Sequence, residues 1–308
     1  MTDAGALAAV DCGTNSTRLL VVGAAGDTRA REMKITRLGE GVDATHQLLP
    51  EAMDRTFSAL RAYRTIMDAE GVDQTRLVAT SAVRDAGNGE GFLQSAADIV
   101  GAPAELLSGQ EEGWLSYAGA TAELVDGSGR LLVVDIGGGS TEVTTAQEDT
   151  ATIRSYSMDV GCVRLTERIL RSDPPTASQV AQAVDTIGTE LASAELVMPE
   201  LAHLGPTRLV GLAGTVSTLA SLELGLADYD RELIHHAELS LEAVERWCDV
   251  LAGETFADRA QRPGLPNGRQ DVIFGGALVL RELMRRLELH TCIVSESDIL
   301  DGLVMSLR

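Results

Sequence analysis

The chain lacks the features that would mark a membrane protein, a secreted protein or a disulfide-rich scaffold. It has no apolar run of about 18 residues, the length that a transmembrane helix needs. No basic segment precedes Arg18, so we expect no secretory signal and a cytoplasmic location. The four cysteines are widely separated and form no C-x-x-C pair, which disfavours a zinc site and a disulfide framework.

Positive charge is also scarce. The 25 basic residues face 46 acidic ones, which gives a net charge of −21. Coating a nucleic acid requires a basic face, so we expect no nucleic-acid partner. A small or linear polyanion stays open as a substrate, because backbone amides, a few arginines and a divalent ion can bind phosphate in an acidic protein. Lys34 is the one lysine, and the 24 arginines suit bidentate phosphate contacts.

One octapeptide pattern occurs twice, 124 residues apart, with five of eight positions identical. The copies are VDCGTNST at residues 10–17 and VDIGGGST at residues 134–141. Each follows an apolar run and precedes another segment of strand character, which predicts a strand, a tight polar turn and a second strand. Such a turn directs backbone N–H groups to one side, and small residues let an anion approach them. Two such turns could hold a phosphate and its metal between them.

The length and the element order indicate two lobes. A chain of 308 residues exceeds what one hydrophobic core usually spans. The order β-β-β-α-β-α-β-α is expected twice, which predicts mixed sheets covered by helices. The segment Asp126-Gly127-Ser128-Gly129 is the expected boundary, giving lobes of residues 1–125 and 126–308. The helices expected from the pattern include residues 50–70, 91–100, 110–121, 177–197, 216–224 and 271–287.

Two segments of the first half offer chemistry and a simpler alternative. Arg84 follows a strand in ATSAVRDAGN (residues 79–88) and could reach a phosphate oxygen, or could be a surface arginine paired with Asp85. Glu111 and Glu112 open a helix in SGQEEGW (residues 108–114), where acids also favour the helix dipole without any other role.

Two segments of the second half are equally open. Gly214 lies in a strand-to-helix turn, LAGTVSTLA (residues 212–220), which suits an anion or nucleotide but is also explained by close packing. Arg269 and Asp271 precede glycines that let a helix pack tightly, and they form either a cap pair or part of a cleft. The pair His235-His236 has no partner at metal-ligand spacing, and we expect no histidine catalysis.

Seven collinear motifs resemble the exopolyphosphatase and guanosine pentaphosphate phosphohydrolase family, a branch of the actin, sugar kinase and Hsp70 ATPase superfamily. They run from residue 11 to about residue 303 and are DCGTNSTRLL, ATSAVRDAGN, SGQEEG, VVDIGGGSTE, GCVRLTE, LAGTVSTLA and RQDVIFGGALVL. The departures are small, with Thr14 where serine is frequent and Gln270 where alanine is usual. The resemblance implies a two-lobe actin-like (ribonuclease H-like) α/β fold with a central cleft, in which the last helix, about 298–308, packs back on the first lobe.

The same resemblance assigns roles by motif position. Glu112 matches the catalytic glutamate and Glu142 the second active-site carboxylate, while Asp135 and Asp11 match the metal-associated positions. The residues expected to bind phosphate are Gly13, Thr14, Asn15, Ser16, Arg84, Gly137, Gly138, Ser140, Thr141 and Gly214. The implied cofactor is Mg²⁺ or Mn²⁺, with a monovalent cation as a further candidate, and the implied assembly is a homodimer.

The implied reaction is hydrolysis of the terminal phosphoanhydride of inorganic polyphosphate. Longer family members carry a further C-terminal module, so we expect a bias toward short chains. Guanosine pentaphosphate (pppGpp) is the alternative substrate. Because fold alone does not choose between functions, an actin-like ATPase or sugar kinase and a non-catalytic polyphosphate sensor also stay open.

Overall fold

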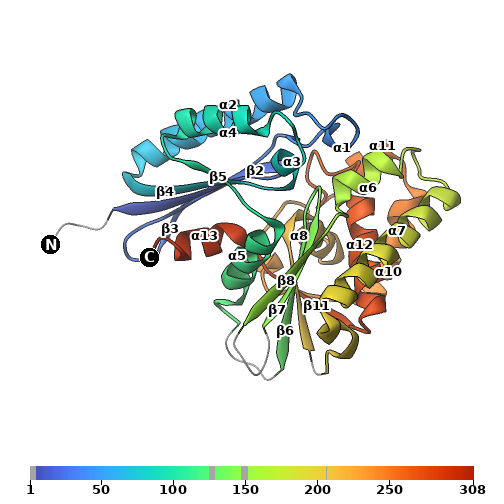
Figure 1. Ribbon diagram of the computed structural model, residues 1–308. Helices are drawn as coiled ribbons and strands as arrows, with labels where there is room; N and C mark the ends of the chain where they lie inside the picture. The colour runs from blue at the N-terminus through green and yellow to red at the C-terminus, as the bar shows by residue number, and fades with distance from the viewer. Residues whose placement is uncertain (1–4, 125–128, 147–151, 206) are drawn as a thin grey trace. The chain divides into compact units, whose positions relative to one another are not determined.

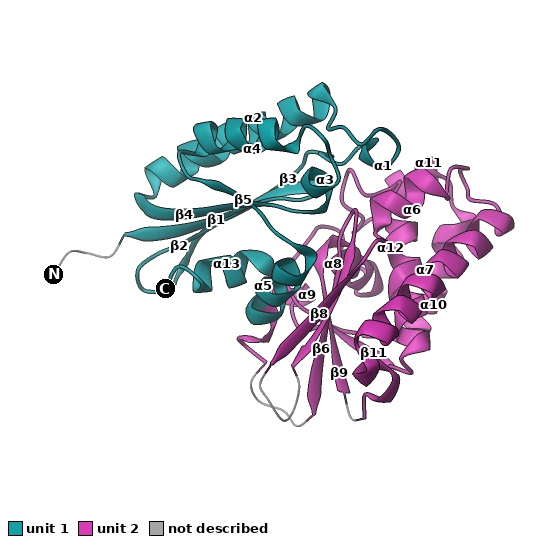
Figure 2. Cartoon of the chain, in the orientation of Figure 1, with its two compact units in different colours: residues 1–119, 299–308 teal, residues 120–298 magenta. Residues whose placement is uncertain are grey.

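The computed structural model describes residues 5–124, 129–146, 152–205 and 207–308 (Figure 1). The chain forms two compact units, one of residues Met1–Gly119 and Ile299–Arg308 and one of residues Ala120–Asp298 (Figure 2). The chain therefore crosses between the units twice, after Gly119 and after Asp298. The expected boundary at 126–129 falls mostly outside the described residues.

Unit 1 is built on a five-stranded mixed sheet of order β3-β2-β1-β4-β5. Strands β1 (Ala6–Cys12), β2 (Ser16–Val22) and β3 (Thr28–Ile35) form an antiparallel meander, while β4 (Val72–Ala79) and β5 (Ala104–Leu106) continue it in parallel with β1. Cys12 pairs with Ala79, and Ala79 pairs with Leu106, so the three parallel strands end at one edge. The segments that follow these three strands therefore begin at the same edge of the sheet.

Both faces of this sheet are covered by helices. Ala8 and Val10 face the core under α2 (Pro50–Ala69) and α4 (Gly89–Val100), whereas Ala9 between them faces a second cluster with Leu300 and Leu303 of α13 (Ile299–Met305). Figure 1 shows α2 and α4 on one side of the sheet and α13 and α5 (Gly109–Thr121) on the other. Strands buried on both faces read as continuous apolar runs, as the first strand does. Short helices α1 (Val42–Thr45) and α3 (Ser81–Arg84) complete the unit.

Unit 2 repeats the arrangement with one extra strand, in the order β10-β11-β9-β6-β7-β8. The meander is β6 (Arg130–Ile136), β7 (Thr141–Ala146) and β8 (Ile153–Met158), and β9 (Thr207–Leu212) and β11 (Thr291–Val294) run parallel to β6. The edge strand β10 (Glu238–Ser240) is antiparallel to β11. Here too the carboxyl ends of the parallel strands lie together, with Asp135 opposite Leu212 and Val294 opposite Gly211.

Helix α12 (Ile273–Arg286) is the central helix of unit 2. Its first eight residues, 273–280, are all buried, and it packs against α6 (Cys162–Arg168), α7 (Ala177–Val197), α8 (Ala213–Glu223) and α10 (Leu241–Gly253). A Cβ at Gly276 would lie 2.2 Å from Oγ1 of Thr215 on α8, so glycine is needed for the close contact of these helices. The remaining short elements are η1 (Pro199–His203), α9 (Arg231–Ile234) and α11 (Phe256–Ala260).

The α/β class, the two mixed sheets and the repeated element order are confirmed. The bounds of α7 agree with the expected range, and α7 begins with a capping box in which Thr176 and Gln179 bond each other's backbone amide. Among the described residues, no helix combines the length and apolar character that crossing a bilayer requires.

Candidate active site

The two copies of the repeated sequence form the same turn. In the first, the Gly13 amide donates to the Ser16 carbonyl at 3.0 Å, and in the second the Gly137 amide donates to the Ser140 carbonyl at 3.0 Å. A Cβ at either glycine would approach that carbonyl oxygen to 3.1 Å. Each turn follows the central strand of its sheet, at the edge where the parallel strands end.

The residue that faces the aspartate differs between the copies. Asp11 is opposite Arg18 on β2, and the Arg18 Nε and Nη2 atoms donate to its Oδ2 at 3.0 and 2.7 Å. Asp135 is instead opposite Glu142 on β7. A cationic partner therefore balances the aspartate of unit 1, while unit 2 carries two acids across neighbouring strands. Like charges directly opposite are destabilising unless a cation or hydrogen bonds offset them.

The acid pair of unit 2 is largely buried. Asp135 is 8% exposed and Glu142 1%, and Oε1 of Glu142 accepts a hydrogen bond from the Ser157 hydroxyl at 2.6 Å. Two buried carboxylates on adjacent strands form an all-oxygen donor set, which suits a hard divalent cation such as Mg²⁺ or Mn²⁺. The residues present therefore fit the implied metal. In unit 1, Oδ2 of Asp11 is already engaged by Arg18.

The start of α6 holds the glycine turn of unit 2. The Cys162 amide donates to the Gly137 carbonyl at 3.0 Å, and the Val163 and Arg164 amides donate to the Gly138 carbonyl at 2.9 and 3.1 Å. Nε of Arg164 donates to the Gly139 carbonyl at 2.6 Å. With its carbonyls held on the α6 side, the turn keeps a fixed shape.

Packing around this turn explains two further residues, Gly161 and Thr141. A Cβ at Gly161 would lie 2.5 Å from the Gly138 carbonyl oxygen, so only glycine fits there. Thr141 is fully buried, and its hydroxyl donates to the Val160 carbonyl at 2.6 Å. Ser140, beside it, is 3% exposed.

The turn of unit 1 is held by the segment after β3. The Asn15 carbonyl accepts from the Thr36 and Arg37 amides at 3.1 and 2.9 Å, and the Thr14 carbonyl accepts from the Gly39 amide at 2.8 Å. Asn15 is 8% exposed, and neither Nδ2 nor Oδ1 of its side chain has a hydrogen-bond partner in the described part of the chain. A buried amide without a protein partner is costly and suggests a ligand or water contact.

The adjacent glutamates at the start of α5 have separate roles. Oε2 of Glu111 accepts from the Ser108 amide at 2.9 Å and from the Ser108 hydroxyl at 2.8 Å, which closes the helix N-terminus. These bonds lower the pKa of the Glu111 carboxyl. Glu112 points elsewhere, and its side chain is only 13% exposed. Glu111 is therefore the capping residue of α5, whereas the Glu112 carboxylate is oriented toward Arg84.

Arg84 lies beside Glu112. Its Nη1 atom donates to the Leu107 carbonyl at 2.8 Å and lies 3.5 Å from Oε2 of Glu112. A surface pair with Asp85 does not account for this placement, because the guanidinium is directed toward the start of α5. Arg84 and Glu112 come from the segments after β4 and β5, so they share the sheet edge at which the Gly13 turn lies.

Gly214 lies against Arg269, which the sequence alone assigns either to a cap pair or to a cleft. A Cβ at Gly214 would lie 1.7–1.9 Å from the guanidinium atoms of Arg269, so the arginine covers the start of α8. A larger residue at position 214 would therefore displace the Arg269 guanidinium from the start of α8. Both residues are near the carboxyl end of β9, the edge that also carries the Gly137 turn.

A family model described as the Ppx/GppA phosphatase family matches residues 23–308. The chain belongs to the Ppx/GppA phosphatase family. Exopolyphosphatase 2 of Mycobacterium tuberculosis is 43% identical over 318 residues, an alignment that covers 98% of each chain. The family match begins after the first turn, whereas this longer alignment includes nearly the whole chain.

Solved structures of similar proteins agree with the fold. The crystal structure of an exopolyphosphatase-like protein is 33% identical with a TM-score of 0.92 and covers 98% of both chains. A Ppx/GppA enzyme of Aquifex aeolicus is 29% identical with a TM-score of 0.80, covering 98% of this chain and 99% of that one. The chain thus has the two-lobe actin-like fold of its Ppx/GppA relatives.

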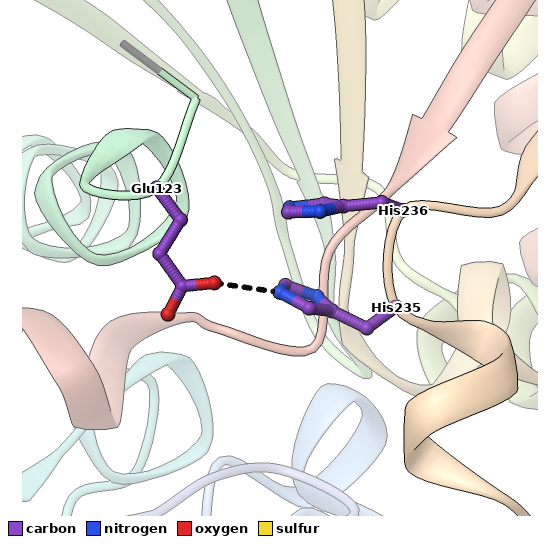
Figure 3. Close-up of side chains that lie close together, drawn as sticks. All are labelled: Glu123, His235 and His236. Carbon is purple, nitrogen blue, oxygen red and sulfur yellow. Dashed lines mark hydrogen bonds and ion pairs between the residues drawn. The ribbon is translucent and has the colours of Figure 1, made fainter.

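Unit 2 of this Ppx/GppA protein also contains a cluster that the sequence did not indicate. Nε2 of His235 lies 2.9 Å from Oε2 of Glu123, and the rings of His235 and His236 stack with centroids 3.8 Å apart (Figure 3). Glu123 is 112 residues away in sequence, so no spacing rule could have paired it with the histidines.

Proposed function

We propose that this chain is an exopolyphosphatase, which hydrolyses the terminal phosphoanhydride of inorganic polyphosphate and releases orthophosphate. The observation that carries the proposal is the placement of Glu112, which Arg84 holds at the sheet edge beside the Gly13 turn while Glu111 takes the capping role. The 43% identity to a protein named Exopolyphosphatase 2 supports polyphosphate as the substrate.

In the proposed reaction, Glu112 accepts a proton from a water molecule as the water oxygen attacks the terminal phosphorus. The bond from that phosphorus to the bridging oxygen breaks, so orthophosphate leaves a chain that is one unit shorter. General-base assistance of this kind contributes roughly 10²–10⁴ in rate. Arg84 donates to an oxygen of the same phosphoryl group and keeps the Glu112 carboxylate in place.

The turns provide most of the remaining phosphate contacts in this proposal. Thr14 and Ser16 donate from the first turn, together with the side-chain amide of Asn15, while Gly13, whose amide is bonded to the Ser16 carbonyl, lets the phosphate approach closely. Gly138, Ser140 and Thr141 donate from the second turn, where Gly137 has the role of Gly13 and Thr141 contributes backbone only because its hydroxyl is bonded to Val160. Gly214 adds the N-terminus of α8.

Asp135 and Glu142 are proposed to hold a divalent cation, whereas Asp11, the other expected metal position, is ion-paired with Arg18. Members of this family are generally dependent on divalent metals. When bound, the ion neutralises charge on the phosphoryl oxygens and orients them. Mg²⁺ is the proposed ion, with Mn²⁺ as a replacement and a monovalent cation as a further candidate.

The decisive assay measures orthophosphate released from short polyphosphate, from long polyphosphate and from pppGpp, with and without Mg²⁺. We expect Mg²⁺-dependent release from polyphosphate that EDTA abolishes and that needs no acceptor alcohol. Release from pppGpp alone would support the alternative substrate. Phosphoryl transfer only to an added acceptor would indicate a kinase, and tight binding without release would indicate a sensor.

The implied homodimer is tested independently of turnover. Sedimentation velocity at two protein concentrations is expected to give about twice the mass of the 32.5 kDa chain. A single species at the chain mass at both concentrations would show a monomer.

A further inference from the structure

Both ring nitrogens of His235 are hydrogen bonded. Nε2 lies 2.9 Å from Oε2 of Glu123 (Figure 3). Nδ1 accepts the backbone N–H of Glu296 at 3.0 Å. A neutral imidazole has one donor and one acceptor nitrogen. Because Nδ1 accepts, the proton resides on Nε2, which donates to Glu123. The hydrogen bond from His235 also lowers the pKa of the Glu123 carboxyl, in keeping with an ionised acceptor.

The two partners of His235 lie next to the two crossings between the units. Glu123 follows the first crossing, at Gly119–Ala120, and Glu296 precedes the second, at Asp298–Ile299. One imidazole therefore joins two segments that are far apart in sequence and that carry every covalent connection between the units.

Further contacts hold the same two segments to the rest of unit 2. Nη2 of Arg231 donates to the Glu296 carbonyl at 3.3 Å, and the Tyr229 hydroxyl bonds the Glu296 carboxylate. Nη2 of Arg208 donates to the Leu124 carbonyl at 3.2 Å. Each of these bonds reaches one segment only, whereas His235 reaches both.

A shared metal ion is a competing explanation for this cluster, because ligand atoms of Glu123, His235 and His236 all lie within 4.8 Å of one another. Two observations oppose it. A metal-bound histidine donates from its other nitrogen, but Nδ1 of His235 accepts. The two rings are also stacked, with 28° between their planes, so their in-plane lone pairs do not converge on one point. The geometry describes a hydrogen-bonded bridge.

We propose that His235 couples the two crossings, so that the two connections move together and the relative movement of the units is restricted. The bridge depends on one imidazole acting as donor on one side and acceptor on the other. This inference concerns motion within the chain and holds for any substrate that the chain uses.

Substitutions at His235 can remove the hydrogen-bond donor and the acceptor of the bridge separately. His235→Gln keeps a donor able to reach Glu123 and loses the acceptor at Nδ1. His235→Asn keeps an oxygen near the Nδ1 position and loses the donor, and His235→Ala removes both. His236→Asn is the matched control, since it removes the stacked ring, and asparagine tolerates the left-handed backbone of φ 66° at that position.

The test measures the distance between labels on the two units by pulsed spin resonance. Glu90→Cys in unit 1 and Ala181→Cys in unit 2 are exposed label sites, and the four natural cysteines are buried. We expect a broader distance distribution in His235→Ala, intermediate breadth in His235→Gln and His235→Asn, and no change in His236→Asn. If His235→Ala does not fold, the Gln and Asn variants carry the test. Equal breadth in all variants would overturn the proposal.

Hydrogen exchange provides a local readout. The Glu296 amide is expected to exchange roughly five- to tenfold faster in His235→Gln and His235→Ala than in the parent chain, and to keep its protection in His235→Asn. Unchanged protection in His235→Gln would contradict the bridge. Binding of one Zn²⁺ per chain that Glu123→Gln and His235→Ala both abolish would also overturn it, because the ion would need Nε2.

Discussion

At the scale of single residues, the adjacent glutamates of α5 provide a matched pair for testing catalysis. Glu112→Gln removes the proposed base and is expected to lower kcat by roughly 10²–10⁴ with little change in KM. Glu111→Gln is expected to retain near-full activity, because glutamine also serves in a capping box. Steady-state phosphate release from polyphosphate compares the two variants. Equal losses in both would assign the effect to the helix start.

The cysteines give a second prediction at this scale. Burial raises the pKa of the Cys248 and Cys292 thiols to about 12, and it also raises the pKa of Cys12 and Cys162. The thiolate is the reactive form, so the native protein is expected to resist iodoacetamide at pH 8. Intact-mass spectrometry should show no adduct before unfolding and four afterwards. Rapid modification of a native thiol would contradict the burial.

Sequence identified the residue types of the site better than their individual roles. The spacing of Glu111 and Glu112 is compatible with either one as the cap, and only the direction of each side chain on α5 separates them. Arg269 over Gly214 and Glu123 beside His235 are contacts between distant segments, so no local pattern contained them.

At the scale of elements, glycines of equal helical propensity are predicted to differ in effect. Gly276→Ala on α12 would place a Cβ 2.2 Å from Thr215, and overpacking of this kind typically costs about 1–3 kcal/mol. Gly188→Ala, at an exposed position of α7 with nothing within 4 Å of the added Cβ, is expected to stabilise by about 0.5–1 kcal/mol. Urea unfolding of both variants measures the difference. Stabilisation by Gly276→Ala would show that α8 and α12 can separate at little cost.

Long, strongly patterned elements were predictable, and several of the shortest were not. Helix α7 was expected at residues 177–197 and is found as Ala177–Val197, with a capping box at its start. Strand β10 has three residues and is defined by its pairing with β11, so it has too few positions to show an alternation. The four-residue helices α1, α3 and α9 are set by their tertiary surroundings for the same reason.

At the scale of the whole molecule, the net charge of −21 predicts a response to salt. Mutual repulsion of the acidic surface disfavours the compact state, and added ions screen it. We expect the thermal midpoint to rise by about 2–5 °C between 20 and 500 mM KCl. Differential scanning fluorimetry without divalent ions measures it. A midpoint that falls with salt would mean that surface ion pairs outweigh the repulsion.

The residue opposite the aspartate of each turn makes the two halves of the repeat electrostatically different. The backbone bend is the same in both halves, yet a single position beyond it is Arg18 in one copy and Glu142 in the other. The repeat thus keeps the backbone shape of its turn, while the side chain opposite the aspartate is positively charged in one copy and negatively charged in the other. Exchanging these two side chains would invert the electrostatic polarity of the repeat and leave its bends intact.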